Sequence, residues 1–123
     1  MITRTRMKSA RKPADDPSCR HDDDLSSDST PLQLDRAASL FRALGDSERL
    51  RLLEMLAHGE RCVTEMAGAV DAGLSTVSQR LKVLRAEQLV SRRRQGKHIY
   101  YSLADEHIAG LVRNALEHVS HKS

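Results

Sequence analysis

The stretch LSTVSQRLKVLRAEQLVSRRRQGKHIYYSL, residues 74–103, changes its hydrophobic period partway along. In its first part, apolar residues recur at intervals of four and three, which predicts a helix from about 74 to 87. Its second part alternates apolar and polar side chains around Gln95-Gly96, which predicts two strands, 89–94 and 97–103, joined by a tight turn. The apolar positions of the predicted helix are Val77, Leu81 and Leu84.

Capping signals mark two helices ahead of that stretch. Residues 30–33 (Thr-Pro-Leu-Gln) form a capping box with proline at the first helical position, and the helix that they start is expected to end at Gly45. A second helix begins at Asp46 or Ser47, since both residue types cap well, and ends at about 58–59. Both helices therefore lie before the helix and hairpin predicted for residues 74–103.

Two further helices complete the pattern. A short helix is expected at about 64–70, and the turn 71–73 separates it from the helix at 74–87. The last helix, at about 105–119, has a single apolar stripe. Two helices joined by a short glycine-containing turn, with a hairpin after the second, predict a winged helix-turn-helix. The fold class is mainly α (α+β), in the order α-α-α-α-β-β-α.

Length and composition suit one small domain preceded by a tail. Residues 1–29 join a basic half to an acidic half without apolar periodicity, so they are expected to be a disordered tail before a domain at 30–123. Aromatic residues are only 2%, which favours a small aliphatic core that a partner subunit completes.

No stretch approaches the roughly 20 apolar residues that span a bilayer, and the basic N-terminus lacks a signal-peptide core. We therefore expect a cytoplasmic protein.

Positive charge is concentrated in one fifth of the chain. Residues 74–98 contain seven Lys or Arg and one acidic residue, although the whole chain has a net charge of only +3. A solvated basic face would look similar, but this segment coincides with the predicted turn, helix and hairpin. It therefore predicts a surface for double-stranded DNA, with hydrogen-bonding side chains in the major groove and cations on phosphates. The expected DNA contacts are Ser75, Thr76, Ser78, Gln79, Arg80 and Lys82 on the helix and Arg92, Arg93, Arg94 and Lys97 on the hairpin.

A set of metal-ligand residue types lies along the last predicted helix. His107 and His118 are eleven residues apart, which leaves them only ~20° apart around a helix but separates them by roughly 16 Å along it. Zinc ligands lie about 2 Å from their ion, so one chain cannot close this site. Two such helices packed antiparallel in a homodimer bring Asp105 and His107 of one subunit to His118 and His121 of the other. Three imidazoles and a carboxylate suit tetrahedral Zn(II).

Together these features resemble the ArsR/SmtB family of bacterial metal-sensing repressors, especially its zinc sensors, over about residues 34–121. The most specific likeness is Asp105-x-His107 followed after ten residues by His118-x-x-His121, which is similar to the family's last-helix zinc motif. The resemblance implies a homodimer whose first and last helices form the interface. It also implies a repressor of metal efflux or sequestration genes that leaves its operator when metal binds. The other matching segments are LGDSERLRLL (44–53), CVTE (62–65), VSQRL (77–81) and QGKHIYYSL (95–103).

Some relatives have another metal site that joins the tail to the third helix. The resemblance implies that Cys62 and Glu65 would provide one half of such a site and Cys19 and His21 of the tail the other. Thr64 stands where thiolate-rich relatives have a second cysteine, which argues against an all-thiolate pocket.

Other functions remain open at this point. Zn(II) is the expected effector, with Co(II), Cd(II) and Ni(II) as alternatives. Cys19 and Cys62 could instead make the protein a thiol or redox sensor, and a DNA-binding protein without a metal response is a further alternative. An enzyme is not expected, because the sequence lacks a His-Glu-x-x-His helix and a glycine-rich phosphate loop.

Overall fold

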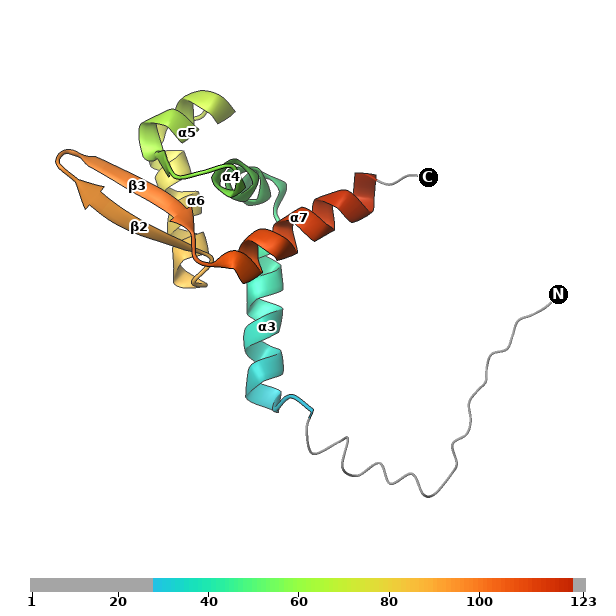
Figure 1. Ribbon diagram of the computed structural model, residues 1–123. Coiled ribbons are helices and arrows are strands. Elements are labelled where there is room, and N and C mark those ends of the chain that lie inside the picture. Colours follow the sequence, from blue (N-terminus) through green and yellow to red (C-terminus); the bar gives the residue numbers. More distant parts are fainter. Residues whose placement is uncertain (1–27, 121–123) are drawn as a thin grey trace, which may run out of the picture. The chain divides into compact units, whose positions relative to one another are not determined.

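The computed structural model describes residues 28–120. By its internal contacts the chain splits into two units, with the boundary between Leu34 and Asp35. The core and the surfaces considered below belong to the second unit, residues 35–120. The described part contains five helices and three short strands, and it confirms the predicted mainly helical winged helix-turn-helix (Figure 1). In chain order the elements are α3 (Pro31–Leu44), α4 (Ser47–Ala57), β1 (Arg61–Cys62), α5 (Val63–Val70), α6 (Leu74–Ala86), β2 (Val90–Gln95), β3 (His98–Leu103) and α7 (Glu106–Ser120).

Side-chain caps determine where three of the helices start. Before α3, the Thr30 backbone N–H donates to Gln33 Oε1 at 2.9 Å, and the Gln33 N–H donates to Thr30 Oγ1 at 3.1 Å, which confirms the predicted capping box. Before α4, Asp46 Oδ2 accepts from the Arg49 N–H at 3.0 Å, so Asp46 rather than Ser47 is the cap. Before α7, Asp105 Oδ1 accepts from the Ile108 N–H at 3.1 Å. Each cap satisfies a donor that the first helical turn leaves unpaired.

The strands form one antiparallel sheet in the order β1-β3-β2. The predicted hairpin is present, but its turn is Gly96-Lys97, one residue later than expected, because Gln95 and His98 still pair. Gly96 has a φ of 65°, a left-handed conformation that glycine adopts without strain. Strand β1 was not predicted. It has only two residues, too few for an alternating pattern to appear in the sequence.

The core lies where α4, α6 and the sheet meet, and it consists almost entirely of aliphatic side chains. As predicted, Val77, Leu81 and Leu84 of α6 are fully buried. On α4, the spacing of the leucines predicts Leu50, Leu53 and Leu56 inward; Leu53 and Leu56 are buried, but Leu50 is only half-buried and Leu52 is fully buried instead. The reason is that α6, α7 and β3 all contact α4, so its buried face is wider than one stripe.

Some large apolar side chains of residues 35–120 are exposed. Phe41 on α3 is 58% exposed and Val119 on α7 is 75% exposed. Phe41 also lines an apolar depression together with Leu44 and Gly45 at the end of α3, Leu50 of α4, and Leu111, Val112 and Ala115 of α7. None of the helices in the described residues is long and apolar enough to cross a membrane.

Candidate DNA interface and metal centre

Helix α6 presents polar side chains opposite its buried face. Gly73 is the residue that precedes its first turn, with a φ of −68° and a ψ of 156°. Ser75, Thr76 and Gln79 are exposed and line a shallow open depression together with Arg80. These are short or amide side chains near a helix N-terminus, the groups that can reach base edges in a major groove. Ser78 and Lys82 are exposed on the same helix.

Arg80, unlike the other polar residues of this face of α6, is largely buried and has an ion-pair partner. Its Nη1 lies 3.8 Å from Glu48 Oε1 in the first turn of α4, and the side chain is three-quarters buried. Contact with a guanine would therefore replace this ion pair. Because a pair at this distance near the surface is weak, the exchange costs little.

The three arginines of the hairpin project from two different faces. In the strand register, Arg92 pairs with Tyr101 and Arg94 with Ile99, whereas Arg93 pairs with Tyr100. Residues that are opposite each other in an antiparallel pair share a face, and neighbours along a strand alternate. Arg92 and Arg94 therefore lie on the face of the buried Tyr101, and Arg93 lies on the other face. All three residues and Lys97 are exposed.

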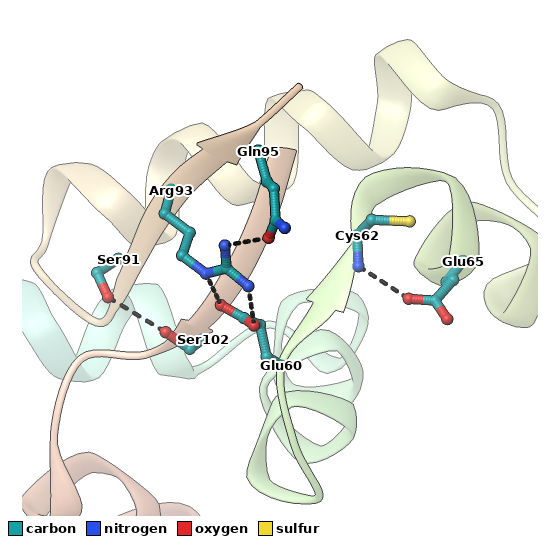
Figure 2. Close-up of polar contacts among 7 residues, drawn as sticks. All are labelled: Glu60, Cys62, Glu65, Ser91, Arg93, Gln95 and Ser102. Atoms are coloured by element: carbon teal, nitrogen blue, oxygen red, sulfur yellow. Dashed lines mark hydrogen bonds and ion pairs between the residues drawn. The ribbon is translucent and has the colours of Figure 1, made fainter. Parts of the chain in front are cut away.

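Arg93 already has partners within the chain (Figure 2). Its Nε donates to Glu60 Oε2 and its Nη2 to Glu60 Oε1, both at 2.8 Å, while its Nη1 donates to Gln95 Oε1 at 2.7 Å. The guanidinium carbon lies 4.9 Å from the centre of the Tyr100 ring. The hydrogen bond from Arg93 lowers the pKa of Glu60, and the same bond raises the pKa of Arg93. The sequence did not indicate these contacts, because Glu60 and Arg93 are 33 residues apart.

The predicted metal ligands lie at the two ends of α7. Asp105 Oδ1 and His107 Nδ1 are 3.6 Å apart, with side chains 55% and 95% exposed. His118 is exposed in the last turn, and His121 lies outside the described residues. Within residues 28–120, no three His, Cys, Asp or Glu side chains come close enough to hold one ion. The carboxylate and imidazole at the start of α7 suit a zinc ion as donors, but they need ligands from elsewhere.

The segment implied for a second site has a structural role at the start of α5. Glu65 Oε1 accepts a hydrogen bond from the Cys62 backbone N–H at 2.9 Å, and this bond lowers the pKa of Glu65. The Cys62 thiol is free and half-buried. Cys19 and His21 lie outside the described residues, so the second site stays a prediction.

The chain is similar to proteins named as transcriptional repressors and regulators. A protein from Synechocystis named transcriptional repressor SmtB homolog is 44% identical over 91 residues, which are 72% of this chain and 69% of that protein. A cadmium resistance transcriptional regulatory protein CadC homolog from Staphylococcus aureus is 37% identical over 82 residues, 66% of this chain and 68% of that protein. The regulator NmtR from Mycobacterium tuberculosis is 41% identical over 96 residues, 76% of this chain and 80% of that protein.

Solved structures show the same fold. A homodimeric winged helix-turn-helix DNA-binding domain from Mycobacterium bovis superposes with a TM-score of 0.69 at 37% identity, covering 79% of this chain and 94% of that one. Residues 46–92, which include α4 to the start of β2, match the family described as bacterial regulatory protein, arsR family. This family consists of regulators rather than enzymes, as the sequence predicted. On these grounds the chain belongs to the arsR family of bacterial regulatory proteins.

Proposed function

We propose that this protein is a homodimeric transcriptional repressor that binds operator DNA in the cytoplasm and releases it when it binds a metal ion, with zinc as the first candidate. One observation supports the metal response most directly. Asp105 and His107 are paired and exposed at the start of α7, and His118 is exposed at its end. Ligands placed this way are incomplete in one chain and complementary between two.

DNA binding is supported by α6 and the hairpin. Ser75, Thr76 and Gln79 are exposed on α6 and line one depression with the partly buried Arg80, and Arg92 and Arg94 add two charges from β2. Side chains of the first kind can recognise bases, and the hairpin arginines can contact the phosphates of an adjacent groove. Relatives named as HTH-type transcriptional repressors are 39% identical to this chain over 85 residues.

Dimerisation is supported by the apolar side chains that α3 and α7 leave uncovered. Phe41 and Val119 are more than half exposed, and the apolar depression lies between Phe41 and Ala115. A partner subunit on this surface would remove a large aromatic side chain from water in each chain, worth roughly 1.5–3 kcal/mol per copy. The similar domain from Mycobacterium bovis is itself homodimeric.

The metal response follows from this arrangement of two subunits. With the α7 helices antiparallel, Asp105 and His107 of one subunit would meet His118 and His121 of the other, giving two equivalent sites. An ion held there would bridge the subunits and fix the distance between the two α6 helices. If that distance no longer matches successive major grooves, DNA binding weakens, and DNA weakens metal binding by the same factor. A hundredfold release needs only about 2.7 kcal/mol of coupling, well below the ~10–16 kcal/mol of a good zinc site.

The test is zinc-induced release of DNA. A fluorescent duplex selected from a random pool by the apo dimer serves as the operator, and anisotropy reports binding as zinc is added. We expect zinc to weaken binding by the native chain, while the His118→Ala/His121→Ala variant stays bound. His58→Ala, which removes an exposed histidine of the α4 end, is the matched control and should respond like the native chain. Equal zinc responses of the native chain and the double variant would exclude the proposal.

A further inference from the structure

We infer that Glu60 and Arg93 form a clamp that positions the hairpin on DNA. Arg93 is then a positioning residue, and Arg92 and Arg94 make the phosphate contacts. The inference rests on DNA binding as proposed above, but not on the metal response. The sequence predicts DNA contacts for Arg92, Arg93 and Arg94 alike, whereas the inference keeps that role for Arg92 and Arg94 only.

The clamp joins the two outer strands of the sheet across the central one. Glu60 directly precedes β1, and Arg93 lies in the middle of β2 on the opposite edge, since the strand order is β1-β3-β2. Between them lies Tyr100 of β3, which pairs with Cys62 on one side and with Arg93 on the other. The guanidinium of Arg93 lies over the Tyr100 ring. From there it donates to both oxygens of the Glu60 carboxylate, as Figure 2 shows.

All three nitrogens of the Arg93 guanidinium have acceptors. Two of them donate to the two oxygens of Glu60, and the third donates to Gln95 near the hairpin turn. A bidentate pair of this kind fixes the plane of the guanidinium as well as its position. A phosphate could bind Arg93 fully only by displacing the Glu60 carboxylate, and it would approach a site that already contains a negative charge.

Arg92 and Arg94 have a different environment. They lie on the face of the hairpin that Tyr101 and Ile99 share, the face whose Tyr101 is buried in the core, and β2 is in contact with α6. Cations on this face are therefore next to the helix that is expected to enter the major groove, where the phosphates of the flanking strand pass. The clamp on the other face holds the hairpin in a fixed orientation relative to α5 and β1.

Removal of Glu60 separates two explanations by the sign of its effect. If Arg93 positions the hairpin, loss of Glu60 frees the hairpin and weakens DNA binding. If Arg93 contacts phosphate and Glu60 only competes for it, loss of Glu60 releases a cation and strengthens binding.

The experiment measures operator affinity of the metal-free protein over a series of salt concentrations for Glu60→Ala, Arg93→Ala and the double variant. We expect each single variant to bind about two- to fivefold more weakly. The double variant should be no weaker than the weaker single variant, because both changes break the same contact. The slope of log affinity against log salt should not change, whereas Arg94→Ala should reduce it by about 0.9, the value of one lost phosphate contact. Glu54→Ala, an exposed carboxylate of α4, controls for the loss of one negative charge.

Amide hydrogen exchange of the free protein supplies a second measurement. Glu60→Ala should speed exchange in residues 93–98 relative to the native chain, since the hairpin loses its tie to β1. Tighter DNA binding by Glu60→Ala, or a smaller salt slope for Arg93→Ala, would overturn the inference. A native chain that binds DNA but ignores zinc would overturn only the proposed metal response, and a native chain that binds no DNA would overturn both.

Discussion

Asp105 caps α7 and is also a proposed zinc ligand, and substitutions can separate these two roles. Its carboxylate caps α7 by accepting a hydrogen bond from the Ile108 N–H at 3.1 Å, and it also lies 3.6 Å from His107 as a proposed zinc ligand. Asp105→Asn keeps an oxygen that can cap the helix, because asparagine caps as well as aspartate. It removes the negative charge that a zinc ligand supplies. Asp105→Ala removes both.

The cap determines how stable the apo variants should be. Replacing a capping aspartate by alanine costs about 1 kcal/mol, within a range of roughly 0.5–2 kcal/mol, and asparagine costs almost nothing. In a domain of this size, about 1 kcal/mol lowers Tm by roughly 4–8 °C. For zinc affinity, by contrast, Asp105→Asn should resemble Asp105→Ala and not the native chain. Both variants lose a charged ligand and should bind zinc at least about tenfold more weakly.

The assays are thermal unfolding in the presence of a chelator and a zinc competition titration. We expect Asp105→Asn to unfold like the native chain and to bind zinc like Asp105→Ala. Apo Asp105→Asn that is as unstable as Asp105→Ala would refute the capping role. Native zinc affinity in Asp105→Ala would refute the role as a ligand.

Three further predictions concern the interface, the acid response and the cysteine. Phe41→Asp should raise the dimer dissociation constant more than about a hundredfold, because two-fold symmetry removes its burial twice; unchanged sedimentation would contradict the proposed interface. The pKa values of Glu60 and Glu65 lie below the ordinary 4.5, so both carboxylates stabilise the fold above that pH and stop doing so as the pH falls through their folded-state values. Glu60→Gln/Glu65→Gln should therefore lose less stability between about pH 6 and about pH 3 in urea titrations, and an unaltered acid response would contradict this. Cys62→Ser should release DNA with zinc like the native chain, and treatment of the native chain with diamide should leave DNA bound; loss of DNA on oxidation would favour the thiol sensor.

Local signals in the sequence predicted most of the fold. The capping box at 30–33, the period of α6 and the glycine of the hairpin turn are all short-range features, and the structure contains each of them. Boundaries moved by one or two residues, as at the turn, where Gly96-Lys97 replaced Gln95-Gly96. Such shifts depend on strand pairing, which the local sequence specifies only weakly.

Contacts between distant segments were not predicted. Strand β1 exists because it pairs with β3, and the Glu60–Arg93 clamp exists because β1 brings Glu60 over the sheet. Neither β1 nor the Glu60–Arg93 ion pair produces a hydrophobic pattern that can be recognised in the sequence. The full burial of Leu52 is of the same kind, since it depends on how many elements surround α4. The candidate zinc ligands stay a prediction, made from residue type and from spacing, because helical geometry converts eleven residues directly into a distance.

Each proposed zinc site contains residues from both subunits, and dimers that combine two different variant chains can test this sharing. One chain has Asp105→Asn with His107→Ala, the other has His118→Ala with His121→Ala, and neither homodimer keeps a complete site. In a mixed dimer the two intact halves face each other at one of the two positions. Equal amounts of the two chains, unfolded and refolded together, should therefore recover tight zinc binding at about half a site per dimer, against two in the native protein. No recovery in the mixture, or tight binding by either homodimer alone, would contradict a shared site.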